Sequence, residues 1–272
     1  MKVISFNTNS IRMRQHQLEA LVKTHNPDVI GIQETKAQDI DFPIEAIESL
    51  GYQCAFHGQK THYGVALLYK QTPVKIYKGF PNDNDADDAQ RRFIAAKFEI
   101  NGEIITVMNG YFPQGDNNKH PDKFPAKKKF YKDLTDLITT QYSADDKLIV
   151  MGDMNIAPLD IDIGIGEDNK KRWLKAGKCS FLPEEREWLQ TLYDWGLHDT
   201  YRQQYPDIND RFSWFDYRSK GFDREPRRGL RIDLILATKN LLDKCTDTGI
   251  EYSVRGMEKP SDHCPIWAEF EL

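Results

Sequence analysis

The sequence has few cysteines and no long apolar runs. Its 272 residues include four cysteines, and no two of them form the Cys-x-x-Cys pair of a zinc knuckle or a dithiol redox motif. Unpaired thiols are typical of a reducing compartment. No stretch approaches the ~18 apolar residues of a membrane span, and the first residues resemble a strand rather than an export leader. We therefore expect a cytoplasmic protein with reduced cysteines and no membrane association.

Motifs of covalent catalysis and nucleotide binding are also missing. There is no Gly-x-Ser-x-Gly elbow. The segment 177–179 is not a P-loop, because it lacks the earlier glycine and the Ser or Thr after Lys178. The acidic run 82–88 is spaced like a calcium loop, yet it lacks the central glycine and the closing glutamate, which favours a solvated loop. The sequence thus shows no sign of a covalent nucleophile or of P-loop chemistry.

What the chain contains is a series of short apolar runs, each flanked by polar residues of catalytic type. In the clearest case, the four apolar residues 148–151 and a glycine precede Asp153 and Asn155. A continuous apolar run is typical of a strand buried on both faces, and side chains two apart on an extended chain point the same way. We therefore expect Asp153 and Asn155 to project together from a strand end. The same pattern recurs beside other polar residues: Asn7, Glu34, Tyr111, Asp233, Asp262 and His263.

The periodicity predicts a mixed α/β fold. Asn101-Gly102 predicts a hairpin between two strand-like runs, so the sheets should be partly antiparallel. Because the candidate residues range from Asn7 to His263, we expect one domain over residues 1–272. Apolar residues at helical spacing occur in three segments, 18–22, 125–138 and 183–195, and Asn26-Pro27 ends the first predicted helix.

Carboxylates dominate the candidate residues. If Glu34, Asp153, Asp233 and Asp262 converge, their repulsion raises their pKa values until some are neutral, and a divalent cation removes that conflict. Oxygen ligands, a carboxamide such as Asn7 and the absence of a thiolate cluster favour Mg²⁺, with Mn²⁺ as a substitute, over zinc. The residues therefore predict a magnesium or manganese site.

The remaining polar residues suggest proton transfer. Asp153, beside the carboxamide of Asn155, is a candidate base for an attacking water. His263 needs a partner that fixes its tautomer, and Asp233 is the candidate; the alternative is a packed structural histidine. Tyr111 is a candidate donor to a developing oxyanion, or else an ordinary packing residue.

Charge is unevenly distributed along the chain. The net charge is −5, yet 169–178 contains five basic and no acidic residues, and 218–231 contains six basic against two acidic residues. Between them, 211–222 interleaves five aromatic residues with Arg and Lys. Basic side chains neutralise phosphates and aromatic faces stack on bases, so these segments predict a nucleic-acid surface. Phe212 and Phe215 are alternatively core residues.

Eight segments carry motif residues: 7–9, 33–36, 109–115, 152–155, 162–166, 213–221, 230–233 and 261–263. Together they resemble the bacterial exonuclease III family, within the endonuclease/exonuclease/phosphatase superfamily. The match runs nearly end to end, and it implies a four-layer α/β sandwich of two mixed β-sheets flanked by helices, like that of DNase I. It also implies a monomeric, magnesium-dependent enzyme of base excision repair. Such an enzyme removes 5′-mononucleotides from 3′ ends of double-stranded DNA, cuts 5′ to abasic sites and clears 3′-blocking phosphates.

The resemblance assigns roles by position. It implies catalytic roles for five residues: Tyr111, Asp153, Asn155, Asp233 and His263. The metal-site residues that we expect are Asn7, Glu34, Asp153, Asn155, Asp262 and His263. An abasic-site pocket falls on Trp214, flanked by Leu230 and Ile232, and further DNA contacts are expected from Gln114, Lys178, Phe215, Arg218, Arg227 and Arg228.

Three positions depart from the family pattern. Ser10 stands where glycine is usual, Cys264 stands where alanine is commoner, and the loop 223–229 is longer.

Two other functions stay open. A lipid or inositol phosphate hydrolase of the same superfamily would share the acidic residues but would not need the basic-aromatic segment. A non-catalytic DNA-binding module would be expected to have lost at least one acidic position.

Overall fold

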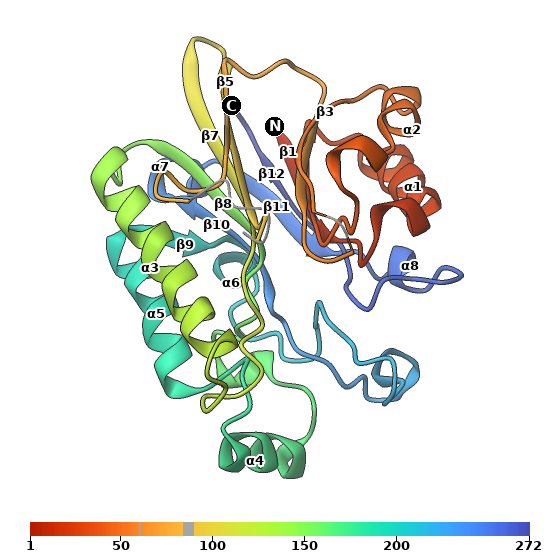
Figure 1. The fold of residues 1–272 in the computed structure, drawn as a ribbon, viewed down its shortest axis with the longest axis vertical. Coiled ribbons are helices and arrows are strands. Elements are labelled where there is room, and N and C mark those ends of the chain that lie inside the picture. Colours follow the sequence, from red (N-terminus) through yellow and green to blue (C-terminus); the bar gives the residue numbers. More distant parts are fainter. Residues whose placement is uncertain (60, 84–89) are drawn as a thin grey trace.

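Two six-stranded mixed β-sheets pack face to face in the computed structural model, which describes residues 1–59, 61–83 and 90–272 (Figure 1). The first sheet has the order β11-β12-β1-β2-β4-β3 and the second the order β5-β6-β7-β8-β10-β9. The first sheet's strands are β1 (Lys2–Asn7), β2 (Val29–Gln33), β3 (Gln53–His57), β4 (Val65–Tyr69), β11 (Cys245–Ile250) and β12 (Ile266–Phe270). The second sheet's strands are β5 (Lys75–Lys78), β6 (Phe93–Ile100), β7 (Glu103–Tyr111), β8 (Lys147–Asp153), β9 (Leu197–Asp199) and β10 (Asp233–Thr238).

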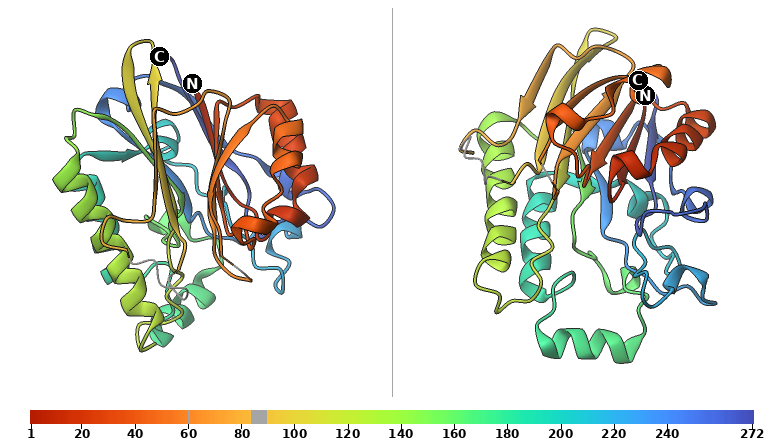
Figure 2. Two further views of the ribbon diagram at one scale, coloured as in Figure 1. Left: turned by 45° about the horizontal axis from the view of Figure 1, so that its top comes forward. Right: turned by 45° about the vertical axis from the view of Figure 1, so that its right-hand side comes forward.

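Helices cover the outer face of each sheet, which confirms the predicted four-layer sandwich (Figure 2). On the first sheet lie α1 (Gln15–His25), α2 (Ile44–Ser49) and α8 (Tyr252–Arg255). The second sheet is covered by the long helices α3 (Lys123–Gln141) and α5 (Pro183–Trp195). The other helices are α4 (Glu167–Ala176), α6 (Thr200–Gln204) and α7 (Lys239–Leu242), with 3₁₀ turns at Ile11–Met13, Asp39–Asp41, Asp160–Asp162 and Gly221–Asp223. Among the described residues, no helix is both long and apolar enough to span a bilayer.

Local signals in the sequence account for several element boundaries. Asn26 adopts the left-handed conformation (φ 45°) and caps the C-terminus of α1. Pro183 occupies the first turn of α5, where its missing N–H costs nothing. Asn101 and Gly102 have positive φ and connect β6 to β7, as the hairpin prediction required.

The strand directions bring the polar strand ends to one edge of the sandwich. The pairs β1–β2 and β7–β8 are parallel, so Asn7, Gln33, Tyr111 and Asp153 end on the same side. β10 runs antiparallel to β8 and places Asp233 directly opposite Asp153. Helix α4 extends beyond this edge, whereas the two chain termini lie at the opposite end (Figure 1). Most of the acidic run 82–88 lies outside the described residues, so its prediction as a solvated loop stays a prediction.

Candidate active site

A cavity of about 300 Å³ opens at this edge, where both sheets contribute residues. Ten of the predicted site residues line it: Glu34, Tyr111, Gln114, Asp153, Asn155, Lys178, Trp214, Ile232, Asp262 and His263. Three lining residues were not predicted: Asn9, Trp173 and Ser180. The segments that carry these side chains lie far apart in the sequence, so the cavity forms only when the two sheets pack together.

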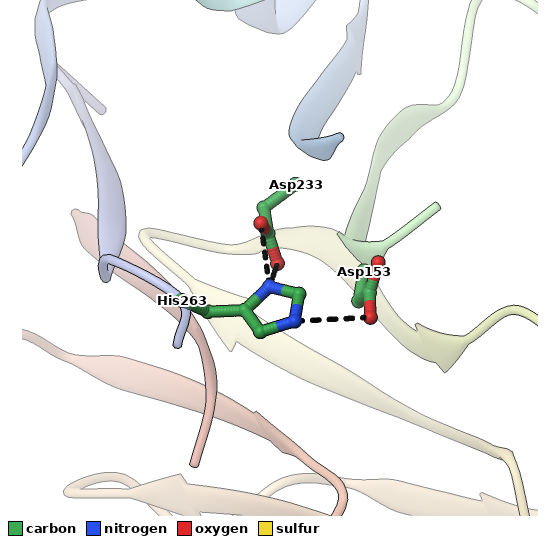
Figure 3. Close-up of side chains that lie close together, drawn as sticks. All are labelled: Asp153, Asp233 and His263. Carbon is green, nitrogen blue, oxygen red and sulfur yellow. Dashed lines mark hydrogen bonds and ion pairs between the residues drawn. The ribbon is translucent and has the colours of Figure 1, made fainter. Parts of the chain in front are cut away.

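Asp153 and His263 line the cavity, and Asp233 lies behind His263 on the adjacent strand; the three side chains form one cluster (Figure 3). His263 Nδ1 lies 2.9 Å from Asp233 Oδ2, and His263 Nε2 lies 3.7 Å from Asp153 Oδ2. The imidazole is therefore held between two buried carboxylates. Burial by itself lowers the pKa of His263, but the negative charges of Asp233 and Asp153 outweigh it and raise the pKa above its ordinary value. Burial raises the pKa of Asp153, and the charge of His263 opposes that rise.

Two asparagines fix the carboxylate of Asp153. Asn7 Nδ2 donates to Asp153 Oδ2 at 3.0 Å, and the backbone N–H of Asn155 donates to Asp153 Oδ1 at 3.1 Å. Asn155 in turn donates from Nδ2 to Phe112 O at 2.9 Å. The prediction that Asn155 follows the alternation of an extended strand is wrong, because Asn155 lies after the end of β8 in the left-handed region, with φ 53°. A tight turn, not the strand period, brings Asn155 beside Asp153.

The close pairing of β7 and β8 just before this turn depends on a glycine. Gly152 has φ 149°, and a Cβ there would lie 1.9 Å from the backbone oxygen of Gly110 on the neighbouring strand. No side chain fits at that separation, so only glycine allows β7 and β8 to approach at their site end.

Glu34 and Asp262 lie on the first sheet's side of the cavity. Glu34 follows β2 with φ 53°, and its Oε1 lies 3.1 Å from Lys36 Nζ. Asn9 Nδ2 donates to Asp262 Oδ1 at 2.9 Å. Burial favours the neutral form of Asp262, but the charge of His263 and the donors Asn9 and Trp214 hold its pKa below the ordinary value. Asp262 is therefore a carboxylate, available to a cation.

One apolar wall contains Trp214, Leu230 and Ile232, the residues on which the resemblance places an abasic-site pocket. Leu230 and Ile232 are buried in a cluster with Phe181, and Trp214 packs against it. The backbone N–H of Trp214 donates to Leu230 O at 2.9 Å, and its indole Nε1 donates to Asp262 Oδ2 at 3.1 Å. The wall is thus anchored both to the core and to the polar side of the cavity.

The other predicted DNA contacts divide into exposed and buried residues. Arg218 and Arg228 are exposed, and Lys178 Nζ lies over the ring of Trp173 at 3.7 Å. The prediction for Phe215 is corrected, because its ring is fully buried against other aromatic rings and offers no surface to DNA. Arg227 is half-buried, with its guanidinium 5.0 Å from two ring centroids, those of Phe222 and Tyr252.

Tyr111 ends β7 beside a buried cation. The guanidinium of Arg92 lies 4.6 Å from the ring of Tyr111 and 4.0 Å from that of Tyr63. Burial raises the pKa of Tyr111 well above its ordinary value, with Glu34 adding to the rise and Arg92 opposing it. Tyr111 therefore keeps its proton and can act as a hydrogen-bond donor.

Sequence reasoning missed the ion pair that supports the rim. Lys127 in α3 and Glu185 in α5 are both 0 % exposed and bond to each other. Lys127 Nζ donates to Asn155 O at 2.8 Å and to Gln114 O at 3.3 Å. Glu185 accepts the backbone N–H of Ser180. Because Lys127 belongs to a run of three lysines, the sequence carries no signal that separates it from its solvated neighbours.

The departures from the family pattern are accommodated locally. Ser10 adopts φ 94°, an angle that favours glycine, while its N–H donates to Glu34 O at 2.9 Å. Cys264 is fully buried against Phe212 and Phe215. The loop 223–229 is largely exposed and lies outside the cavity.

Residues 4–263 match the model of the endonuclease/exonuclease/phosphatase family. The chain belongs to this family. It is 58% identical over 271 residues to exodeoxyribonuclease III of Haemophilus influenzae, covering all of both chains. A variant of the 3′ phosphatase NExo from Neisseria, bound to a product DNA hairpin, has a TM-score of 0.88 at 34% identity, with both chains fully covered. An AP endonuclease from Archaeoglobus fulgidus has a TM-score of 0.88 at 33% identity, again over both whole chains.

Proposed function

We propose that this protein is a magnesium-dependent DNA phosphodiesterase. Its activities are 3′-to-5′ exonuclease on double-stranded DNA, cleavage 5′ to abasic sites and removal of 3′ phosphates, and it acts as a single-domain monomer. The observation that carries the proposal is the buried Asp153–His263–Asp233 cluster beside a cavity that Lys178 and two tryptophans also line. The relatives support each activity, since they include an exodeoxyribonuclease, a 3′ phosphatase and an AP endonuclease.

The donor set fits a hard divalent cation. Glu34, Asp153 and Asp262 face one cavity, and the burial that raises the pKa of Asp153 is the cost that a cation would remove. We place the cation on this oxygen-rich side, because Asp233 and Asp153 raise the pKa of His263 and so favour the imidazolium, which has no lone pair for a metal ion. When bound, Mg²⁺ or Mn²⁺ supplies positive charge to the phosphate oxygens at the transition state. Asn7 acts through Asp153, since its carboxamide donates to that carboxylate.

The chain's own residues supply proton transfer and orientation. Asp153, fixed by Asn7 and Asn155, accepts the proton of the attacking water. Asp233 accepts a hydrogen bond from His263 Nδ1–H and orients the ring, and the two flanking aspartates favour the charged imidazolium. In this proposal the imidazolium Nε2–H, on the side of Asp153, stabilises the negative charge of the reacting phosphate. Tyr111 donates a hydrogen bond to the same phosphate. Hydrolysis then needs no covalent intermediate.

DNA binding uses the segments that extend beyond the sheet edge. Arg218 and Arg228 are exposed there and are suited to phosphate contacts, and α4 adds further lysines. Trp214, with Leu230 and Ile232 behind it, provides an apolar wall that fits a deoxyribose without its base. A hydrolase of small inositol phosphates would have no use for this extended basic surface.

Three duplexes test the proposal directly. Blunt, abasic and 3′-phosphate duplexes are incubated with the protein in Mg²⁺, in Mn²⁺ and in excess chelator, beside inositol phosphates as a comparison. We expect cleavage of all three duplexes only with a divalent cation, and Asp153→Asn serves as the inactive control. Cleavage in chelator, or faster hydrolysis of inositol phosphates than of any duplex, would contradict the proposal.

A further inference from the structure

A chain of hydrogen bonds joins the acidic side of the cavity to the tryptophan wall. Lys36 Nζ lies 3.1 Å from Glu34 Oε1 and donates to Asn9 Oδ1 at 2.5 Å. Asn9 Nδ2 donates to Asp262 Oδ1 at 2.9 Å, and Trp214 Nε1 donates to Asp262 Oδ2 at 3.1 Å. Each oxygen of the Asp262 carboxylate therefore accepts one bond, one from the side of Glu34 and one from the wall.

The backbone makes this link stiff. Phe215 N–H donates to Asp262 O at 2.9 Å, and Trp214 forms an isolated β-bridge with His263. Trp214 is also bonded in both directions to Leu230. These bonds hold the backbone of Trp214 beside that of Asp262, and the indole N–H links the two side chains directly.

We propose that Trp214 is a positioning residue for the cation site, so that cation binding and the contact of Trp214 with DNA are coupled. The inference rests on the proposed function in one respect, namely that a divalent cation binds among Glu34, Asp153 and Asp262. Hydrogen bonds to a ligating carboxylate orient it, and their loss typically weakens metal binding 10–100-fold. Because coupling between two sites is reciprocal, the cation changes the affinity for abasic DNA by the factor by which that DNA changes the affinity for the cation.

Trp214→Phe tests this with a matched control. Phenylalanine keeps an aromatic wall but removes the N–H that holds Asp262. Trp173→Phe is the control, because Trp173 lines the same cavity and stacks on Phe181, yet its indole N–H bonds to no described residue. The affinity for Mn²⁺, and then for Mg²⁺, is measured by calorimetry on the DNA-free protein. We expect Trp214→Phe to bind Mn²⁺ about tenfold more weakly and Trp173→Phe to bind it within about twofold of the original protein. Equal affinity in the Trp214 variant would overturn the inference.

A second variant approaches Asp262 from its other oxygen. Asn9→Gly removes the donor to Oδ1, and glycine tolerates the left-handed backbone at this position (φ 45°). Since both donors act through one carboxylate, we expect the losses in cation affinity of Asn9→Gly and Trp214→Phe to be non-additive in the double variant. Additive losses would also overturn the inference. If the unaltered protein binds no divalent cation or fails to cut abasic duplex, the proposed function fails instead, which these titrations separate from failure of the coupling.

Discussion

Replacing Lys127 with methionine tests whether the ion pair between α3 and α5 supports the rim of the active-site cavity. Lys127 and Glu185 are both 0 % exposed. Methionine has a similar length but no charge, so Glu185 would remain buried without its cation. The backbone oxygens of Asn155 and Gln114 would lose the ammonium donor at the same time.

The expected loss is large because the pair is buried. Removing one partner of a buried ion pair typically costs about 3–5 kcal/mol, since the other charge stays uncompensated. The total free energy of unfolding of a protein is about 5–15 kcal/mol, so the variant should lose a substantial part of its stability. The same two helices offer a control, because Lys128 and Glu184 pair at 3.1 Å with side chains 61% and 45% exposed. Such an exposed pair contributes about 0–1 kcal/mol.

Urea unfolding of Lys127→Met, Lys128→Met and the double variant Lys127→Met/Glu185→Gln measures these differences. We expect Lys127→Met to show the large loss, Lys128→Met to remain within about 1 kcal/mol of the original protein, and the double variant to recover part of the stability. The kcat of folded Lys127→Met should also fall, because Lys127 no longer bonds to the backbone oxygen of Asn155, whose N–H holds Asp153. Equal losses in Lys127→Met and Lys128→Met would refute the reasoning.

Three further predictions separate catalysis from binding. Asp153→Asn should lower the rate of duplex cleavage about 10²–10⁴-fold and preserve DNA binding. Cleavage rate and binding affinity are both measured on the same abasic duplex. His263→Asn and Asp233→Asn should each impair exonuclease and abasic cleavage, and the double variant should be little worse than His263→Asn because the two act as a unit; additive losses would mean that they do not. Arg228→Ala should weaken binding to every duplex alike and reduce the slope of log affinity against log salt by roughly one unit; a defect confined to abasic DNA would contradict this.

Much of the fold was predictable because its signals are local. The hairpin at Asn101-Gly102, the cap at Asn26 and the helix that begins at Pro183 follow from backbone preferences of single residues. Apolar runs indicated the buried strands, and polar residues at their ends indicated the cavity. The resemblance added the roles of individual residues and the identity of the wall around Trp214.

The rest depended on contacts between distant segments, which no local pattern encodes. Lys127 looks like its exposed neighbour Lys128, and only the packing of α3 on α5 buries one of them. Phe215 and Trp214 are adjacent aromatic residues in the same basic segment, yet the ring of Phe215 is buried in the core whereas Trp214 lines the cavity. The two-residue alternation placed Asn155 correctly for the wrong reason, since a left-handed turn produces its position.

The location of the cavity follows from how a sandwich of two sheets can hold buried charge. Asp153 and Asp233 come from adjacent strands of the second sheet, whereas Glu34 follows a strand of the first sheet. Burying such groups is unfavourable unless each has a partner. Hydrogen bonds across the sheets satisfy this requirement, as Asn7 of β1 shows by donating to Asp153 of β8. A displacement of one sheet against the other would therefore leave buried carboxylates without partners, so the groups that we propose for the chemistry also stabilise the packing of the two sheets.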